Sequence, residues 1–170
     1  MTENMLKGTA RLVNRRMKFE CLVEGKPPVY EDYIPPYGDG EGHTALELLL
    51  LSLASCFGSS IRFLLGSRLK TEPEALAVEA RGIRRTEHPL GFRSIQLELL
   101  LEAPGVDPRD LELCIALAEE KICPVYAMIR GNAEISVAYR LNGRISGQAD
   151  GPTAGNTPEA EAVGAGKAAV

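Results

Sequence analysis

The sequence predicts an α+β domain from two kinds of periodicity. In several short stretches, apolar residues recur at every second position, which is typical of half-buried strands. From residue 45 to about residue 65 the chain is instead apolar on nearly every side, which is typical of a helix enclosed by the fold or by a partner subunit. Strands and helices follow one another without a regular βαβ repetition, and this order favours the α+β class.

The first part of the chain is expected to form strands. Asn14-Arg15-Arg16 is predicted to connect a hairpin between residues 6–13 and 17–24. A third short strand is predicted at 29–34, and the glycine-rich run 37–43 is expected to be a loop. In the second of these strands the alternating apolar residues are Met17, Phe19, Cys21 and Val23.

The long apolar helix is expected to be followed by a second hairpin. The turn residues His88-Pro89-Leu90-Gly91 separate two stretches of strand periodicity. The apolar residues that define these two strands are Leu76, Val78 and Ala80, and then Ile95, Leu97 and Leu99.

A second helical region begins at Asp107-Pro108, where Asp supplies an N-cap and Pro takes the first helical position. It is predicted to run to about Ile122. Pro124 then interrupts it, because proline lacks the amide proton and disfavours helix at the residue before it. A short helix is predicted at 125–130 and a last strand at 135–141.

Composition divides the chain into an ordered domain, residues 1–142, and a tail, residues 143–170. The tail contains no aromatic residue and consists largely of Gly, Ala, Pro, Thr and acidic residues. Such a segment buries too little apolar surface to offset the entropy lost on ordering, so we expect it to be flexible.

Charge and composition exclude several classes of protein. The 19 basic and 23 acidic residues leave a net charge of −4, which argues against nucleic-acid binding. The longest uncharged stretch, residues 48–61, has 14 residues, fewer than the roughly 20 of a membrane span. No basic segment followed by an apolar run opens the chain, so we expect no secretion and no membrane. Four cysteines are too few for a disulfide scaffold, and we expect cytoplasmic thiol chemistry.

Cys56 lies in the middle of the apolar helix and allows two interpretations. In the first interpretation Cys56 is an inert core thiol, since free cysteine is among the most buried residue types. Alternatively it is reactive, because small residues around it would let another backbone approach the sulfur closely. These small residues are Ala54, Ser55, Gly58 and Ser59.

Cys123 precedes Pro124 and is therefore expected at the cap of a helix. There, unpaired amide protons and the helix dipole favour the thiolate. Lowering the pKa from about 8.5 to about 6 would raise the ionised fraction at pH 7 roughly thirtyfold. The alternative is that Cys-Pro only interrupts a helix, and the sequence leaves both open.

The remaining candidates have simpler explanations. There is no Cys-x-x-Cys, and His43 and His88 match no common zinc spacing, so no metal site is expected. Cys21 and Cys114 are assigned to the core. Arg15 and Arg16 at a hairpin tip, and Glu47 near a helix start, are ordinary solvated or dipole-complementing charges by default.

In combination these motifs resemble a known family. A run ending in Ala-Ser-Cys, residues 46–56, is followed 67 positions later by Cys123-Pro124-Val125. Arg130-Gly131-Asn132 precedes the last predicted strand, and Asp32-Tyr33-Ile34-Pro35-Pro36-Tyr37-Gly38 leads into the first helix. Over about residues 5–141 the sequence resembles the osmotically inducible protein C and organic hydroperoxide resistance (OsmC/Ohr) family.

The resemblance implies an OsmC-like fold in which antiparallel sheets wrap around central helices in an intertwined homodimer. It implies that Cys56 attacks a hydroperoxide and that Cys123 converts the sulfenic acid into a Cys56–Cys123 disulfide. It also implies that no cofactor is used and that electrons come from a dithiol or a lipoylated protein.

Two charged residues are assigned through the resemblance. The family's glutamate corresponds most nearly to Glu47, and its hairpin arginine to Arg15 or Arg16, of which we take Arg16. Glu47 precedes Cys56 by two and a half helical turns, which places the two on roughly opposite faces. It would therefore act through a partner side chain or across a dimer interface.

The sequence thus predicts a thiol-dependent peroxidase of oxidative-stress defence. Leu53, Phe57 and Tyr126 are expected to line an apolar pocket that favours organic hydroperoxides as substrates. Two alternatives remain. One is a non-enzymatic homodimer that binds a small apolar ligand, and the other is a thiol enzyme that acts on a reactive sulfur species.

Overall fold

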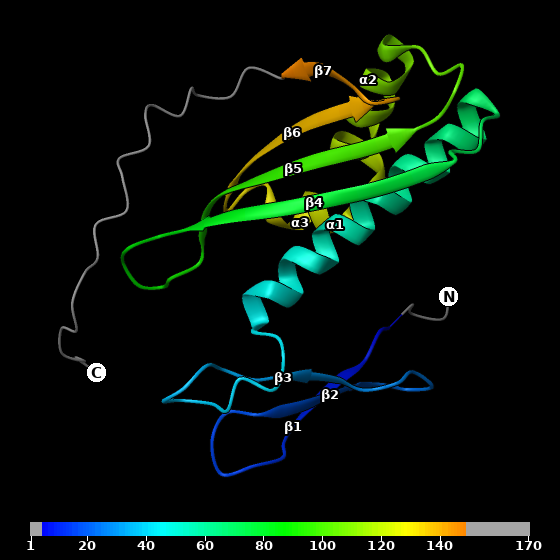
Figure 1. The fold of residues 1–170 in the computed structure, drawn as a ribbon. Coiled ribbons are helices and arrows are strands. Elements are labelled where there is room, and N and C mark those ends of the chain that lie inside the picture. Colours follow the sequence, from blue (N-terminus) through cyan, green and yellow to red (C-terminus); the bar gives the residue numbers. More distant parts are fainter. Residues whose placement is uncertain (1–4, 149–170) are drawn as a thin grey trace.

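The computed structural model describes residues 5–148, which form two β-sheets and a long central helix (Figure 1). This mixed architecture confirms the predicted α+β class. The elements in order are β1 (Gly8–Leu12), β2 (Phe19–Val23), β3 (Val29–Glu31), α1 (Ala45–Leu64), the π-helical η1 (Leu65–Leu69), β4 (Ala75–Arg84), β5 (Phe92–Glu102), α2 (Pro108–Leu117), the π-helical η2 (Ala118–Ile122), α3 (Pro124–Ile129), β6 (Glu134–Leu141) and β7 (Arg144–Gln148).

The smaller sheet contains β1, β2 and β3 in antiparallel order. In Figure 1 it lies beyond the N-terminal end of α1, apart from the larger sheet. All five residues of β1 are exposed, and the five residues of β2 are at most half-buried. The small sheet therefore has no hydrophobic core of its own within the described residues.

The larger sheet has the strand order β4-β5-β6-β7. The β4–β5 pair is antiparallel, as expected, and β6 pairs antiparallel with β7, a strand that the sequence analysis does not predict, but β5 and β6 are parallel. The expectation of a purely antiparallel sheet is therefore wrong for this pair. The cause is the helical region between these two strands, which returns the chain to the same end of the sheet in a crossover.

The ordered domain extends beyond the predicted boundary at residue 142. β7 pairs with β6 through a turn in which Asn142 has φ 52° and Gly143 has φ 71°. Two consecutive left-handed residues form the type I′ turn that an Asn-Gly pair favours. The predicted tail thus begins too early, and its remainder, residues 149–170, lies outside the described residues.

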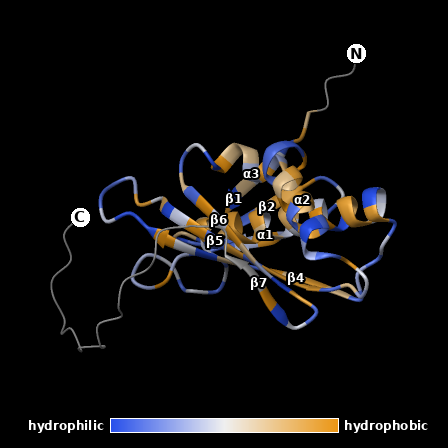
Figure 2. Cartoon of the chain, turned by 90° about the horizontal axis from the view of Figure 1, so that it is seen from above, coloured by the Kyte–Doolittle hydropathy of each residue, from blue (hydrophilic) through white to orange (hydrophobic). Residues whose placement is uncertain are grey.

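A single hydrophobic core joins α1 to the larger sheet and to the C-terminal helices. One face of α1 contributes the buried residues Leu53, Phe57 and Ile61. Every second residue of β5 points into the same core, namely Ile95, Leu97, Leu99 and Leu101. In the view of Figure 2, apolar residues, drawn in orange, occupy long parts of both the strands and the helices.

The apolar helix extends beyond the uncharged stretch at residues 48–61. Together, α1 and η1 span Ala45–Leu69, a segment long and apolar enough by composition to cross a bilayer. Arg62 interrupts the apolar run and pairs with Glu72 at 2.7 Å. A core helix of a soluble fold passes the same test, and Leu53, Phe57 and Ile61 of this helix are fully buried against the protein itself.

Gly82 of β4 makes room for the ring of Phe92 on β5, because a Cβ atom at Gly82 would overlap that ring. Replacing Gly82 with Ala is expected to displace Phe92 and to lower the free energy of unfolding by about 1–3 kcal/mol. Urea unfolding measures this loss. Gly91→Ala, in the same hairpin but with open space around its Cα, is the control, and an equal loss in both variants would contradict the prediction.

Candidate active site

The structure brings together Cys56 and Cys123, which are 67 residues apart in the sequence. Cys56 lies within α1, and Cys123 stands between η2 and α3. The Sγ atoms are 3.2 Å apart, and both cysteines are free thiols. Since a disulfide has an S–S distance of about 2.05 Å, an approach of about 1 Å would join them.

The position of Cys123 depends on a break in the helical region. The sequence predicts one helix up to Ile122, whereas the structure ends α2 at Leu117 and continues with a π-turn, η2. The backbone N–H of Cys123 donates to the carbonyl of Ala118 at 3.0 Å and closes this turn. Cys123 then adopts an extended backbone (φ −83°, ψ 103°), and Pro124 opens α3 as expected.

The two sulfurs differ in their access to solvent. Cys56 is half-buried, whereas Cys123 is 2% exposed. The backbone N–H of Tyr126 donates to the Cys123 sulfur at 3.4 Å, which is the predicted capping contact. Of the two residues, Cys56 is therefore the more exposed to solvent.

Burial raises the pKa of the Cys123 thiol above its ordinary value, and the neighbouring Cys56 sulfur raises it further. The N–H of Tyr126 and the hydroxyl of Ser60 act in the opposite direction. The expectation that the helix cap lowers this pKa is therefore wrong in its net result. The local effect is present, but the loss of hydration around a buried thiolate outweighs it.

The three predicted pocket residues do not form an open cavity in the single chain. Leu53 and Phe57 are fully buried members of the core. The ring of Tyr126 lies 6.0 Å from that of Phe57, and its hydroxyl donates to Glu119 at 3.3 Å. Burial and the nearby Glu119 carboxylate raise the pKa of Tyr126 to about 12, so this phenol is neutral at physiological pH.

Glu47 stabilises the start of α1. Its backbone N–H donates to the side chain of Thr44, while its carboxylate accepts the backbone N–H of Thr44 at 2.7 Å. This capping box lowers the pKa of Glu47, chiefly through the Thr44 backbone N–H. The nine residues to Cys56 correspond to about 14 Å along the helix axis, so the two side chains do not meet within one chain.

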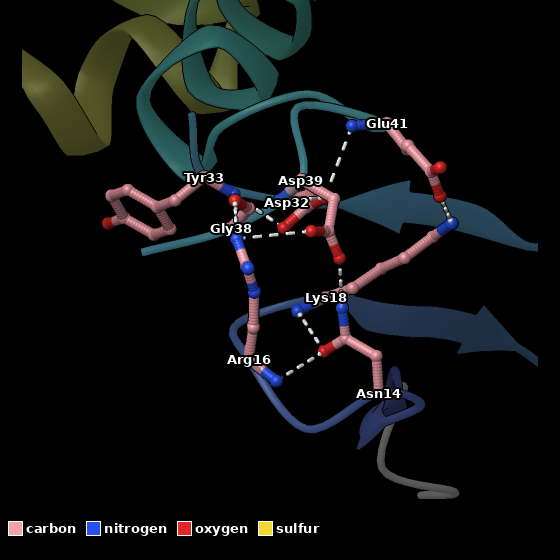
Figure 3. A network of polar contacts seen from close by, with 8 residues as sticks. All are labelled: Asn14, Arg16, Lys18, Asp32, Tyr33, Gly38, Asp39 and Glu41. Carbon is pink, nitrogen blue, oxygen red and sulfur yellow. Dashed lines mark hydrogen bonds and ion pairs between the residues drawn. The ribbon is translucent and has the colours of Figure 1, made fainter. Parts of the chain in front are cut away.

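Arg16 lies in the turn between β1 and β2, and its side chain points to the glycine-rich loop (Figure 3). Its guanidinium donates to the carbonyl of Gly38 at 3.1 Å and pairs with Asp39 at 3.3 Å. Arg15 is exposed. The structure thus holds the hairpin arginine against the glycine-rich loop and not against a sulfur of the same chain.

The other two cysteines are far from equivalent. Cys114 is buried in the core, as expected, and burial raises its pKa. Cys21 is only half-buried, contrary to the expected core position, because the small sheet that carries it contributes no residue to the hydrophobic core. Among residues 5–148, no group of three or more His, Cys, Asp and Glu side chains is placed to hold a metal ion.

A groove runs along α1 and the start of β4, and Cys56 is not among its lining residues. Small residues dominate the helical side of the groove, and its large lining side chains there are Arg62 and the apolar Leu51 and Phe63, which are 55% and 60% exposed. The helical lining includes Leu51, Ala54, Ser55, Gly58, Ser59 and Phe63.

The sequence profile of the OsmC-like protein family matches residues 38–138, which include both cysteines and the helices that carry them. The chain belongs to the OsmC-like family. No curated protein matches the sequence significantly.

Solved structures share the OsmC fold with this chain at low sequence identity. An OsmC-like protein from Mycoplasma pneumoniae has a TM-score of 0.70 at 20% identity, over 82% of this chain and 99% of that chain. A hypothetical protein from Aquifex aeolicus has a TM-score of 0.70 at 22% identity, with 81% and 96% covered. The organic hydroperoxide resistance protein OhrB of Bacillus subtilis has a TM-score of 0.55 at 19% identity, with 80% and 98% covered.

Sequence analysis missed the buried carboxylate that organises the loop in front of α1 of this OsmC-like chain. Asp32 is 1% exposed and accepts the backbone N–H groups of Tyr33, Asp39 and Glu41 at 2.9–3.1 Å. Burial by itself raises the pKa of Asp32, but these three donors outweigh it and the pKa is lowered. The only signal in the sequence is an acidic residue before a glycine-rich run, which is too common to be diagnostic.

Ser60 was missed as well. It is 5% exposed, one helical turn beyond Cys56, and its hydroxyl donates to the Cys56 carbonyl at 2.9 Å. A polar residue four positions from a candidate nucleophile on a helix shares its face, and this spacing was the available signal.

Replacing Asp32 with Asn is expected to lower the free energy of unfolding at pH 7, because an amide nitrogen cannot accept a backbone N–H. The folded-state pKa of Asp32 lies below its ordinary 3.8, so its stabilisation is present above that pH and is lost as the pH falls further. Urea unfolding at pH 7 and in acid should therefore show a difference between variant and wild type that shrinks in acid.

Asp39→Asn is the matched control for this experiment. Asp39 lies in the same loop, but its side chain is 41% exposed and pairs with Arg16 at the surface. Such pairs contribute about 0–1 kcal/mol, so this variant should stay close to the wild type. A pH-independent loss in Asp32→Asn would show that charge has no part in holding the loop.

Proposed function

We propose that this OsmC-like protein is a thiol-dependent peroxidase that reduces organic hydroperoxides. The observation that carries the proposal is the 3.2 Å distance between the Cys56 and Cys123 sulfurs. The difference in burial supports an order of events in which half-buried Cys56 reacts with the peroxide and buried Cys123 reacts second.

The proposed cycle has three balanced steps. The Cys56 thiolate attacks one peroxide oxygen of ROOH, the O–O bond breaks, and Cys56 becomes a sulfenic acid while the alkoxide takes a proton to leave as ROH. The Cys123 thiol then displaces water from the sulfenic acid and forms the disulfide. Finally an external dithiol, either small or carried on a lipoylated protein, reduces the disulfide by exchange and is itself oxidised.

Organic hydroperoxides fit this site better than hydrogen peroxide. Cys123 belongs to the hydrophobic core and Cys56 packs against it, and the same core contains the rings of Phe57 and Tyr126, 6.0 Å apart. An alkyl or aryl group gains free energy by leaving water for such surroundings, whereas hydrogen peroxide has no apolar part to bury. The name of the Bacillus subtilis relative, an organic hydroperoxide resistance protein, supports the same substrate class.

The geometry also bears on the two alternatives. A ligand-binding protein with purely structural cysteines would be expected to hold them too far apart or too enclosed to bridge, and a separation of 3.2 Å does not fit the first of these expectations. A reactive sulfur species as substrate would leave a persulfide on Cys56 in place of a sulfenic acid. Mass spectrometry of the protein after peroxide or polysulfide exposure distinguishes these chemistries.

Replacing Cys56 with Ser is expected to abolish turnover of cumene hydroperoxide with dithiothreitol, a loss of at least about 1,000-fold, because the nucleophile is removed. Replacing Cys123 with Ser should leave the first attack intact and trap a sulfenic acid on Cys56, detected by mass spectrometry after dimedone labelling. Cys21→Ser is the control and should retain wild-type turnover. Full activity in Cys56→Ser would refute the proposal.

We further propose that the working unit is a homodimer in which a second copy covers the exposed apolar surface. This surface comprises the groove on α1 and the small sheet, whose uncovered large apolar residues would be costly to leave in water. These exposed residues of the small sheet and its loops include Leu12, Val23, Val29, Tyr30, Ile34 and Tyr37.

In such a dimer, Arg16 and Glu47 would act on the reactive cysteine of the other subunit. Within one chain, Arg16 is held by Gly38 and Glu47 caps α1, and neither is bonded to a cysteine sulfur. An arginine delivered to the partner subunit's thiol would stabilise a thiolate, and the carboxylate would orient that guanidinium. We therefore assign both a role across the dimer interface.

Replacing Ala54 with Arg is expected to weaken the dimer about 30-fold or more, because it places a charged side chain in the middle of the groove. Sedimentation equilibrium measures the dissociation constant. Ser52→Arg adds the same charge at an exposed position on α1 outside the groove lining and should leave association unchanged. An Ala54→Arg variant that stays as tightly dimeric as the wild type would refute this interface.

A further inference from the structure

Tyr126 contacts three parts of the candidate site at once. Its backbone N–H donates to the Cys123 sulfur at 3.4 Å, and its ring lies 6.0 Å from that of Phe57, the residue after Cys56 on α1. Its hydroxyl donates to the Glu119 carboxylate at 3.3 Å. Glu119 lies on η2 and Tyr126 on α3, so this last bond spans the Cys-Pro break that carries the second thiol.

The backbone bonds at Cys123 leave the direction of α3 open. The N–H of Cys123 belongs to η2, because it donates to the carbonyl of Ala118 at 3.0 Å. The carbonyl of Cys123 belongs to α3, because it accepts the N–H of Ala127 at 3.1 Å. The two peptide planes are joined by φ and ψ of Cys123, the two soft dihedrals of the backbone. The six-residue helix can therefore turn as a unit unless side chains hold it.

Glu119 is the residue at which side chains tie α3 back to η2. Within residues 5–148, the side-chain hydrogen bonds from α3 and its C-cap to η2 both end on Glu119. The Tyr126 hydroxyl donates to its carboxylate, and the Arg130 guanidinium donates to its carbonyl at 3.5 Å. Glu119 is half-buried and Tyr126 is 8% exposed, so water competes weakly for the bond between their side chains.

We propose that Glu119 is a positioning residue of the resolving step, which holds α3 through the Tyr126 hydroxyl and so keeps the Cys123 sulfur beside that of Cys56. This role rests on the proposed peroxidase function. In the resolving step the S–S bond forms, the S–O bond of the Cys56 sulfenic acid breaks, and the thiol proton leaves with the hydroxide as water. The 3.2 Å separation of the sulfurs lets this bond form with little movement.

Holding the second thiol in place favours the disulfide over the two separate thiols. The S–S bond closes within the molecule, so its equilibrium constant scales with the effective concentration of one thiol at the other. If α3 could turn about Cys123, this effective concentration would fall. The rate of closure and the equilibrium content of disulfide would then fall together.

The test measures the Cys56–Cys123 disulfide of the full chain in two ways, one of which needs no peroxide. In the first, the protein is brought to equilibrium in buffers of reduced and oxidised glutathione, and the oxidised form takes up the two electrons and two protons of the dithiol. Alkylation and peptide mass spectrometry give the disulfide fraction. In the second, one equivalent of cumene hydroperoxide is added to reduced protein, and closure of the same disulfide is followed by quenched mass spectrometry.

We expect Tyr126→Phe, which keeps the ring, and Glu119→Ala each to lower the equilibrium constant of disulfide formation about fivefold and to slow closure similarly, since one hydrogen bond is lost. The double variant should be no worse than either single variant, because both remove the same bond. Glu119→Gln keeps an acceptor oxygen and should restore both quantities. Tyr139→Phe is the matched control and should change neither, because the buried Tyr139 hydroxyl donates to Glu112 at 2.8 Å, in a pair outside η2 and α3.

An unchanged glutathione equilibrium in Tyr126→Phe would overturn the role of Glu119, and so would a wild type that forms no Cys56–Cys123 disulfide in these buffers. Additive losses in the double variant would show that the two residues act separately. An equal loss in Tyr139→Phe would also overturn it, because a general loss of stability would then explain the effect. If peroxide produces no sulfenic acid on the wild type, the peroxidase proposal fails instead, and the glutathione equilibrium still decides whether Glu119 holds the pair.

Discussion

The arrangement of the site depends on a proline that stops one helix and starts another. Pro124 has no N–H to donate, so the helical region gives way to a π-turn in which Cys123 bonds back to Ala118. The extended residue between the two helices then points its sulfur at Cys56 instead of continuing around a helix. π-Turns are rare and concentrate at functional sites, and here the turn supplies the approach that a regular helix could not give.

The single chain is complete around its larger sheet and incomplete around its smaller one. The larger sheet, α1 and the C-terminal helices bury a common core, whereas β1 and one side of α1 face outward. A sheet without a core is not stable alone, so its partner surface must come from elsewhere. The proposed reaction shares this dependence, because Arg16 and Glu47 are proposed to act across the same dimer interface.

The sequence predicted the parts of the fold that local chemistry dictates. The strand alternation of β5, the Asp-Pro start of α2 and the Cys-Pro start of α3 each have a short-range cause, and each was placed within a few residues. Features that depend on contacts between distant segments or on burial could not be predicted from the sequence. The parallel pairing of β5 with β6 depends on where the crossover returns the chain, and the pKa of Cys123 depends on burial by segments distant in sequence. The cap position of Cys123 could be predicted, but not that burial would affect its pKa more than the N–H of Tyr126 does.

Cys123 is subject to two opposed requirements. Burial protects its thiol from external oxidants and keeps it beside Cys56, but burial also disfavours the thiolate that must attack the sulfenic acid. A permanent positive charge beside it would remove the second difficulty and, by ionising the thiol at rest, expose it to premature oxidation.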